Sequence, residues 1–272
     1  MLSRRALHDH LHAAVRAARA VGPLLLRWAG RPTRVTTKRS AIDLVTEIDR
    51  RAEERIRGIL SRATPRVGFF GEETHTAAPP AACCWYVDPI DGTTNFVHGV
   101  PIFCISIGLI VNGVSHLGVI YDPMREELFT AITGQGSFLN GRRIRVSRTQ
   151  RLADSLFATG FPTEFRQAPR KFLRPFAALQ QTTHAVRRMG SAALNLAYVA
   201  CGRLDGVWEE RIWPWDIAAA LVLLQEAGAR ATTFRNRPSR VSDDHVLATN
   251  GRVHRPALRA MRGALRHAPA TR

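Results

Sequence analysis

Cysteine is scarce in this sequence of 272 residues, which contains only four. Cys83 and Cys84 are adjacent, whereas Cys104 lies in an apolar run and Cys201 ends a segment with helical periodicity. No two of them have the CxxC spacing of a zinc site, and four are too few for a disulfide-based scaffold of this length. We therefore expect buried free thiols.

Long hydrophobic runs are also absent. The longest apolar stretches are far shorter than the roughly 20 residues that a membrane-spanning helix needs. The segment after Met1 is rich in His, Ala and Arg and contains Asp9, so it lacks the apolar core of a signal peptide. With 45% hydrophobic and 22% charged residues, and no repeat or low-complexity linker, the composition is typical of a globular protein. These features predict a cytoplasmic protein that does not enter a membrane.

Lysine is nearly absent, with only Lys38 and Lys171, and the acidic residues are too few to balance the arginines. The formal net charge is +17. Such a charge attracts nucleic-acid backbones, so an RNA- or transcription-complex accessory protein is one interpretation. The other is an arginine-rich, solvated surface. We favour the second, because the sequence has no basic motif with interleaved aromatic residues and no zinc-finger spacing.

The first half of the chain shows helical periodicity and then strand signals. Apolar residues recur on one helical face from Leu7 to Ala18, and Thr46 with Asp49 resembles the capping box of a second helix. The Asn-Gly pairs at 112–113 and 140–141 separate apolar runs and predict two hairpins, the second continuing as a strand over 142–146. We expect two helices on a largely antiparallel sheet.

The second half alternates between strand and helix patterns, which predicts a smaller α/β part. We divide the chain into residues 1–147, an α+β half with an antiparallel sheet and most of the candidate metal ligands, and residues 148–272, an α/β half. Strands are expected at 155–159, 185–189, 205–209 and 245–249, and helices near 170–181, 191–201 and 214–227.

Several motifs of other phosphate-binding proteins are missing. The sequence has no P-loop and no Gly-x-Ser-x-Gly elbow, and the glycine pair at 134 and 136 lacks the third glycine of a dinucleotide site. A haloacid-dehalogenase-type phosphatase requires Asp-x-Asp after a strand. Here Asp88 and Asp91 are three residues apart, which excludes that class.

Asp88 and Asp91 follow an apolar strand pattern and precede a Gly-Thr-Thr-Asn sequence. Crowded carboxylates repel each other unless a cation holds them. Oxygen ligands without His or Cys favour a hard cation, magnesium before calcium, and the Ile90 carbonyl can add a further oxygen. The free N–H groups of Gly92 and Thr93 suit a phosphate. An acidic turn is the alternative, which the Gly-Thr-Thr-Asn continuation disfavours.

Two more acids occur beside apolar segments. Glu72 follows the strand pattern at 67–70, and Asp216 lies in the first turn of an otherwise apolar helix. Asp216 can be explained as an acid that complements the helix dipole. A carboxylate among Trp215 and the apolar residues 217–219 nevertheless needs a partner, and a metal ion is a suitable one.

Together these residues resemble the inositol monophosphatase family, within the wider group of lithium-sensitive, magnesium-dependent sugar phosphatases. The resemblance implies a layered αβαβα sandwich of the sugar-phosphatase type, with α+β and α/β parts, and a homodimer. It covers nearly the whole chain through the motifs Asp43-Leu44-Val45-Thr46-Glu47-Ile48-Asp49, Gly71-Glu72-Glu73, 88–96, Tyr121-Asp122-Pro123, Gly190-Ser191-Ala192-Ala193, 202–206 and Pro214-Trp215-Asp216.

The resemblance also implies a role for each matching residue. Thr93, oriented by Asp49, and Glu72 would position and deprotonate an attacking water. The metal ligands would be Glu72, Asp88 and the Ile90 carbonyl for one Mg²⁺, and Asp88, Asp91 and Asp216 for a second, with Glu72 helping to hold a third. Asp91, Gly92 and Thr93 would bind the phosphate, and Lys38, Gly190, Ser191, Ala192 and Glu209 would face the rest of the substrate.

The implied activity is the magnesium-dependent hydrolysis of a small phosphorylated polyol or sugar, with inositol monophosphate as the first choice. Histidinol phosphate, fructose 1,6-bisphosphate and 3′-phosphoadenosine nucleotides stay open as alternatives. Members of the group share the metal site and differ mainly at the rim of the pocket, so the motifs alone do not select the substrate.

Overall fold

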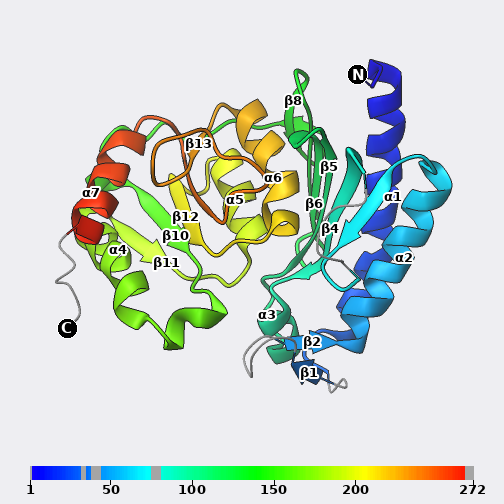
Figure 1. Ribbon diagram of the computed structural model, residues 1–272, viewed down its shortest axis with the longest axis horizontal. Coiled ribbons are helices and arrows are strands. Elements are labelled where there is room, and N and C mark those ends of the chain that lie inside the picture. Colours follow the sequence, from blue (N-terminus) through cyan, green and yellow to red (C-terminus); the bar gives the residue numbers. More distant parts are fainter. Residues whose placement is uncertain (1, 32–34, 38–43, 75–80, 267–272) are drawn as a thin grey trace.

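The computed structural model describes residues 2–31, 35–37, 44–74 and 81–266, which form five layers in the order helix, sheet, helix, sheet, helix (Figure 1). This arrangement confirms the expected layered sandwich. The helices are α1 (Arg4–Trp28), α2 (Glu47–Ala63), α3 (Thr93–His98), α4 (Pro169–Thr182), α5 (Ala192–Ala200), α6 (Pro214–Ala227) and α7 (His254–Arg266), with short 3-10 helices η1 (Leu152–Asp154) and η2 (Thr163–Arg166).

The first outer layer consists of α1 and α2, which lie side by side on one face of the larger sheet (Figure 1). Both helices were predicted from their apolar spacing. Leu7, Ala14 and Ala18 of α1 are buried, together with Ile56 and Leu60 of α2, in one core cluster with the sheet. The opposite faces carry charged residues, so these helices are amphipathic surface helices.

The larger sheet has the strand order β3-β4-β5-β6-β7-β8-β9 and is antiparallel except for the β3–β4 pair. Both predicted hairpins are present, and Asn112 and Asn140 have φ of 50° and 49°, as a turn of type I′ requires. The sequence analysis missed β7. The strands are β3 (Gly68–Gly71), β4 (Cys83–Asp91), β5 (Cys104–Val111), β6 (Val114–Asp122), β7 (Glu127–Ile132), β8 (Gly136–Leu139) and β9 (Arg142–Arg143). A separate pair is formed by β1 (Val35–Thr37) and β2 (Leu44–Thr46).

The strand predicted over 142–146 ends after Arg143. The Ile144 N–H still bonds to the Ser137 carbonyl at 2.9 Å, but the Val146 N–H bonds to the carbonyl of Ala227 at 3.2 Å. The chain therefore leaves the sheet here and crosses to the end of α6. A competing backbone acceptor in another element ends the strand, and local sequence carries no signal of it.

The middle layer contains α5 and α6, whose side chains are buried on nearly every face. Helix α6 approaches the larger sheet very closely at Gly108 and Gly118, which are directly paired between β5 and β6. A Cβ atom on Gly108 would lie 2.7 Å from the Ala218 carbonyl carbon, and one on Gly118 would collide with the Ala219 carbonyl oxygen. The missing side chains let the helix backbone lie directly on the sheet.

Two hydroxyl groups fix α6 in this position. The Ser106 hydroxyl donates to the Trp215 carbonyl at 3.0 Å, and the Ser115 hydroxyl donates to the Ala218 carbonyl at 2.6 Å. Both serines are buried, so each bond satisfies a group that would otherwise be costly to remove from water. The first turn of α6, which contains Asp216, is therefore held at a defined place beside β5.

The second sheet has the order β11-β10-β12-β14-β13, and helices α4 and α7 cover its outer face (Figure 1). The predicted strands and helices of this half are present, although α7 and β13 were missed. The strands are β10 (Leu156–Thr159), β11 (Ala185–Arg187), β12 (Gly206–Glu210), β13 (Arg230–Thr232) and β14 (His245–Thr249).

The two halves share extensive contacts. Helix α6 belongs to the second half in sequence but packs on β4, β5 and β6 of the first. The Arg203 guanidinium forms two hydrogen bonds with the Glu127 carboxylate, at 2.6 and 2.5 Å, between the halves. In the sequence, the last strand of the larger sheet ends at Arg143 and the first strand of the second sheet begins at Leu156. The division into 1–147 and 148–272 stays a prediction.

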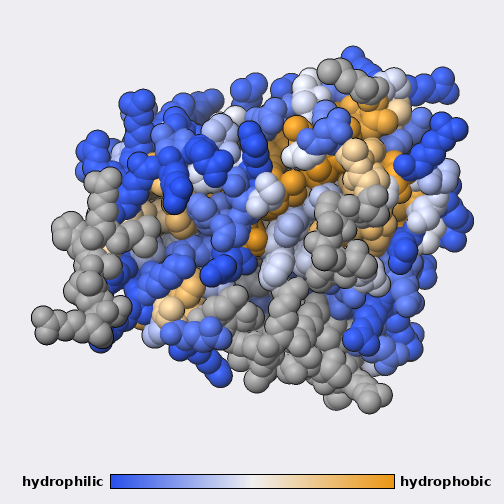
Figure 2. All heavy atoms as spheres, viewed as in Figure 1, coloured by the Kyte–Doolittle hydropathy of each residue, from blue (hydrophilic) through white to orange (hydrophobic). Residues whose placement is uncertain are grey.

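Among the coloured residues of the face in Figure 2, hydrophilic ones cover most of the surface, and a hydrophobic area lies towards the upper right. Within the described residues, no helix combines the length and hydrophobicity needed to cross a membrane. All four cysteines are free, as expected, but only Cys84 and Cys104 are fully buried, whereas Cys83 and Cys201 are partly exposed.

His254 at the start of α7 is a buried histidine that makes two hydrogen bonds. Its Nε2 lies 3.0 Å from the Thr232 hydroxyl, and its Nδ1 lies 3.0 Å from the Thr249 hydroxyl. Burial, and then the charge of Arg230, lowers the pKa of His254 to about 4. The side chain is therefore neutral in the folded protein at neutral pH and joins α7 to β13 and β14.

We expect this histidine to make the fold acid-sensitive. The unfolded chain takes up a proton near pH 6.5, whereas the folded protein does so only near pH 4. Stability is therefore fully present above pH 6.5 and falls as the pH drops towards 4, by roughly 3 kcal/mol. Urea unfolding between pH 7 and pH 4.5 should show this loss. The free energy of unfolding should fall less steeply with decreasing pH in His254→Gln than in wild type. An equal slope in His254→Gln and wild type would contradict the assignment, and His184→Gln, at an exposed position, is the control.

Candidate active site

Asp88 and Asp91 lie at the carboxyl end of β4, where the strand contains a bulge. Asp88 pairs with Ser106 and Asp91 with Cys104, so β4 carries one more residue than β5 between these pairs. The bulge accommodates Pro89, which cannot donate to a sheet, and it re-aims the side chains that follow. The Asp88 carboxylate accepts the Ile90 N–H at 2.9 Å, which fixes the local turn. Both aspartates are buried.

Glu72 reaches the same place from the neighbouring parallel strand. Its N–H donates to the Val87 carbonyl at 3.0 Å, one residue beyond the last pair of β3 with β4. The carboxyl ends of parallel strands lie at one edge of a sheet, so Glu72 is placed next to Asp88. The negative charge of Glu72 raises the pKa of Asp88, Asp91 and Asp216, which shows that it belongs to the same cluster.

Asp216 joins this cluster from the first turn of α6. One carboxylate oxygen from each of Asp88, Asp91 and Asp216 lies within 4.8 Å of the other two. The Asp216 carboxylate also accepts the Trp213 N–H at 3.0 Å, which caps the helix and orients the side chain. The structure thus brings Asp216 of the second half next to Glu72, Asp88 and Asp91 of the first half.

The electrostatics of the cluster favour a bound positive charge. Burial, and then the charges of Glu72, Asp91 and Asp216, raise the pKa of Asp88 well above its usual range. Burial and the neighbouring carboxylates also raise the pKa of Asp216 strongly. No lysine or arginine forms an ion pair with the three aspartates among the residues described. An all-oxygen, buried and crowded donor set fits a hard divalent cation.

Asp91 has a second set of partners at the N-terminus of α5. Its carboxylate accepts hydrogen bonds from the Ser191 hydroxyl, from the Ala192 N–H at 3.2 Å and from the Ala193 N–H at 2.7 Å. These bonds partly offset the effect of burial, yet the pKa of Asp91 is still raised. Ser191 and Ala192, expected on the substrate side, therefore also hold a metal-ligand candidate in place.

Thr93 lies between two acceptors at the start of α3. Its hydroxyl is 3.0 Å from the Ile90 carbonyl and 3.4 Å from the Asp49 carboxylate of α2. A hydroxyl donates one proton, so the shorter contact is the stronger one in this state. Asp49 is fully buried, and the predicted pair of Thr93 and Asp49 is within contact distance.

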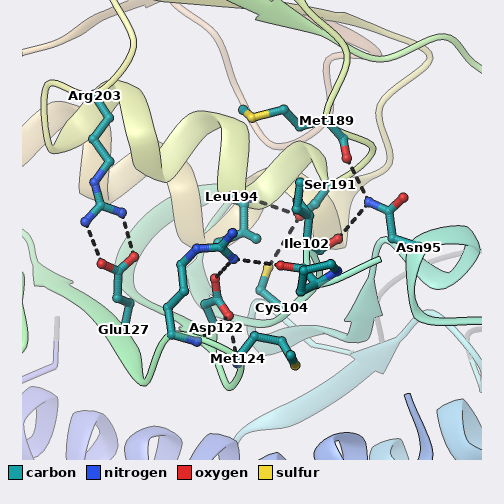
Figure 3. A network of polar contacts seen from close by, with 12 residues as sticks. Asn95, Ile102, Cys104, Asp122, Met124, Glu127, Met189, Ser191, Leu194 and Arg203 are labelled. Atoms are coloured by element: carbon teal, nitrogen blue, oxygen red, sulfur yellow. Dashed lines mark hydrogen bonds and ion pairs between the residues drawn. The ribbon is translucent and has the colours of Figure 1, made fainter. Parts of the chain in front are cut away.

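Gly92 and Gly190 allow two loops to approach each other. Gly92 has φ of 100°, and a Cβ atom on it would lie 2.9 Å from the Ile102 carbonyl oxygen and 3.2 Å from that of Gly190. The Asn95 side chain lies against Gly190 and, as Figure 3 shows, donates to the Ile102 carbonyl at 2.8 Å and to the Met189 carbonyl at 2.7 Å. Asn95 thereby ties α3 to the segment that precedes α5.

A pocket of about 740 Å³ opens beside these acids, between α3, the segment at 160–166, and the ends of β11 and β12. Asp91 and Asp216 line it together with Gly190, Ser191, Ala192 and Glu209. Burial raises the pKa of Glu209 to about 7, although the Asn195 amide and the Gly160 N–H donate to its carboxylate. The substrate-side candidates except Lys38 thus line one cavity, and Lys38 lies outside the described residues.

The sequence analysis missed Glu53, a fully buried acid of α2. Its carboxylate accepts the Glu73 N–H at 2.7 Å and the Thr74 hydroxyl at 2.5 Å. It also occupies the space that a Cβ atom on Gly71 would need. Glu53 therefore holds the segment that carries Glu72. A charged residue four positions after Asp49, on the apolar face of α2, was the available signal.

Comparison with known proteins supports the same conclusion. The sequence model of the inositol monophosphatase family matches residues 6–266. A protein of Synechocystis named inositol-1-monophosphatase is 41% identical over 256 residues, which are 94% of this chain and 89% of the relative. A Pseudomonas aeruginosa protein named Nus factor SuhB is 40% identical over 254 residues, 91% of this chain and 94% of the relative.

The solved structure of the inositol monophosphatase from Anabaena has a TM-score of 0.85 and 40% sequence identity, covering 94% of this chain and 96% of that one. With the five-layered sandwich and the buried carboxylates beside a pocket, these matches identify the protein as a phosphatase of a metal-dependent family. The chain belongs to the inositol monophosphatase family.

Replacing Glu53 should weaken metal binding more than substrate binding. In Glu53→Ala the Glu73 N–H and the Thr74 hydroxyl lose this acceptor, so the segment that carries Glu72 is held less firmly, although the bond from the Glu72 N–H to the Val87 carbonyl remains. We expect the Mg²⁺ concentration for half-maximal activity to rise about tenfold, with a smaller change in the substrate KM. Glu53→Gln keeps one acceptor oxygen, so its Mg²⁺ concentration for half-maximal activity should lie between those of wild type and Glu53→Ala.

Glu54→Ala, at the exposed neighbouring position, is the control for this experiment. The Mg²⁺-induced rise in Tm provides a readout that does not depend on activity. This rise should be largest in wild type, smaller in Glu53→Gln and smallest in Glu53→Ala. Equal metal dependence in Glu53→Ala and Glu54→Ala would refute the positioning role.

Neutralising Asp88 should stabilise the metal-free protein. Asp88→Asn removes one of the crowded charges and keeps an acceptor for the Ile90 N–H, so the free energy of unfolding without divalent ions should rise by about 1 kcal/mol or more. With Mg²⁺ present, wild type should gain stability and the variant much less. Asp122→Asn is the contrasting control, because Asp122 has Arg125 as a partner at 2.9 Å and should lose stability. A loss of metal-free stability in Asp88→Asn would contradict the proposed repulsion.

Proposed function

We propose that this protein hydrolyses inositol monophosphate or a closely related small phosphate monoester, with Mg²⁺ as its cofactor. The observation that carries the proposal is the cluster of Asp88, Asp91 and Asp216, whose oxygens lie within 4.8 Å beside a pocket of substrate size. The match to the inositol monophosphatase family and the name of the Synechocystis relative support the substrate class.

The chain provides ligands for two or three Mg²⁺ ions. Glu72, Asp88 and the Ile90 carbonyl would hold one, and Asp88, Asp91 and Asp216 would hold another, with Glu72 contributing to a third. When bound, the ions supply positive charge that acidifies water and offsets the charge of the transferring phosphoryl group. The Ile90 carbonyl already accepts from Thr93, and a carbonyl oxygen has a second lone pair for a cation.

The protein's own side chains orient the reacting groups. Thr93, in contact with Asp49, would direct the attacking water, and Glu72 would accept its proton. Asp91 and the N–H groups of Gly92 and Thr93 would position the phosphate. The substrate's alcohol side would face Gly190, Ser191, Ala192 and Glu209 in the pocket, and the family resemblance adds Lys38 to the substrate-binding residues.

Phosphate release with and without Mg²⁺ tests this proposal directly. The substrates are inositol 1-phosphate, histidinol phosphate, fructose 1,6-bisphosphate and a 3′-phosphoadenosine nucleotide. We expect Mg²⁺-dependent release, highest for inositol 1-phosphate among the monophosphates, and a fall of about a thousandfold in Asp216→Asn, which corresponds to about 4 kcal/mol. Unchanged turnover after removal of all divalent ions would disprove the mechanism.

An RNA- or transcription-complex accessory role is the second candidate. The net charge of +17 favours it, and so does the similarity to a protein named Nus factor SuhB. The buried carboxylates argue against this as the sole function, because binding RNA through a basic surface has no use for them. A homodimer and a cytoplasmic location complete the proposal, on the grounds of the family resemblance and the sequence features.

A further inference from the structure

The pocket contains a basic part that the proposed chemistry does not use. Arg166, Arg188 and Arg211 line the same cavity of about 740 Å³ as Asp91 and Asp216. All three arginines are exposed to solvent within it. Phosphate cleavage is assigned to the carboxylate side, so the guanidinium groups are left without a role in a reaction on a simple monophosphate.

Arg188 is held in place by an aromatic pair. Its guanidinium carbon lies 5.3 Å from the centre of the Phe161 ring, and Phe161 stacks on Phe165 with ring centres 4.6 Å apart. A cation over an aromatic face is oriented while its N–H groups stay available at the edge. Within the described part of the chain, neither Arg166 nor Arg188 forms an ion pair with a carboxylate.

Arg211 occupies an unfavourable backbone conformation. Its φ is 59°, in the left-handed region that a glycine adopts without cost. Its only ion-pair contact among the described residues is a long one, 3.9 Å to the exposed Asp244, which contributes little to stability. A side chain at a strained position in a pocket is more typical of a binding role than of a role in folding.

We propose that Arg166, Arg188 and Arg211 form a subsite for a second anionic group of the substrate, a phosphate or a carboxylate. The preferred substrates then carry the phosphate ester that is cleaved and a second charge that the guanidinium groups bind. This inference rests on the proposed function, because the first phosphate is cleaved at the carboxylate cluster. The cavity volume lies within the roughly 300–1,000 Å³ of pockets that hold a complete small ligand.

Two matched substrate pairs test the subsite. Fructose 1-phosphate and fructose 1,6-bisphosphate differ by a second phosphate, and glycerol 2-phosphate and 2-phosphoglycerate differ by a carboxylate. In wild type with Mg²⁺ we expect kcat/KM to be about tenfold higher for the substrate with the second anionic group, in at least one pair. The pair that discriminates identifies the anion, and the preference should fall as the salt concentration rises.

Two variants connect this preference to the arginines. Arg188→Gln and Arg211→Gly should each reduce the ratio of kcat/KM within the discriminating pair by severalfold, about three to ten times. Arg211→Gly should at the same time maintain or raise the Tm, since glycine relieves the strained backbone. A loss of preference in a protein that is at least as stable cannot come from misfolding.

Two control variants distinguish loss of the subsite from the general effects of removing an arginine or relieving backbone strain. Arg148→Gln removes an exposed arginine outside the pocket, and Glu126→Gly relieves another left-handed residue, with φ of 53°. Both should leave the ratio unchanged. Equal kcat/KM within both pairs, or an unchanged ratio in Arg188→Gln and Arg211→Gly, would overturn the subsite while leaving the proposed function intact. If no phosphate is released from these substrates or from inositol 1-phosphate, the proposed function fails as well.

Discussion

Mutual repulsion between buried carboxylates is the constraint on which this site depends. The oxygens of three aspartates lie within 4.8 Å of one another, and burial together with the charge of Glu72 raises the pKa of each of them. The fold keeps them close through backbone features that do not depend on their charge. The bulge in β4 directs Asp88 and Asp91, and the paired glycines under α6 let Asp216 approach them. Packing and hydrogen bonds elsewhere in the fold therefore offset the free-energy cost of burying these carboxylates next to one another.

The features that were predictable from sequence are those in which local pattern and chemistry agree. The spacing of Asp88 and Asp91 after an apolar strand, followed by glycine and threonine, already pointed to a cation and a phosphate. The Asn-Gly pairs gave the hairpins because two consecutive residues with positive φ suit little else. Asp216 was recognisable because an acid in an apolar helix needs a partner.

The remaining features depend on contacts between distant parts of the chain. Glu53 stands out in sequence only as a charged residue on the apolar face of α2, and its bonds to Glu73 and Thr74 in the structure show that it supports the segment of Glu72. Gly108 and Gly118 carry no local signal, since their role is set by a helix about a hundred residues later. Strand β9 ends at Arg143, and the Val146 N–H bonds instead to the Ala227 carbonyl at the end of α6. Such effects are determined by tertiary contacts, which local secondary-structure propensity does not predict.

The location of α6 has a consequence for the order of folding events. Its Asp216 is contributed from the second half of the chain to acids that all come from the first, so an isolated first half lacks the complete set. Under the proposed function, a cation would bind with full affinity only after α6 has docked on the larger sheet. Once bound, it would connect α6 to β4 and stabilise the docked state, because it closes a long stretch of chain into a loop.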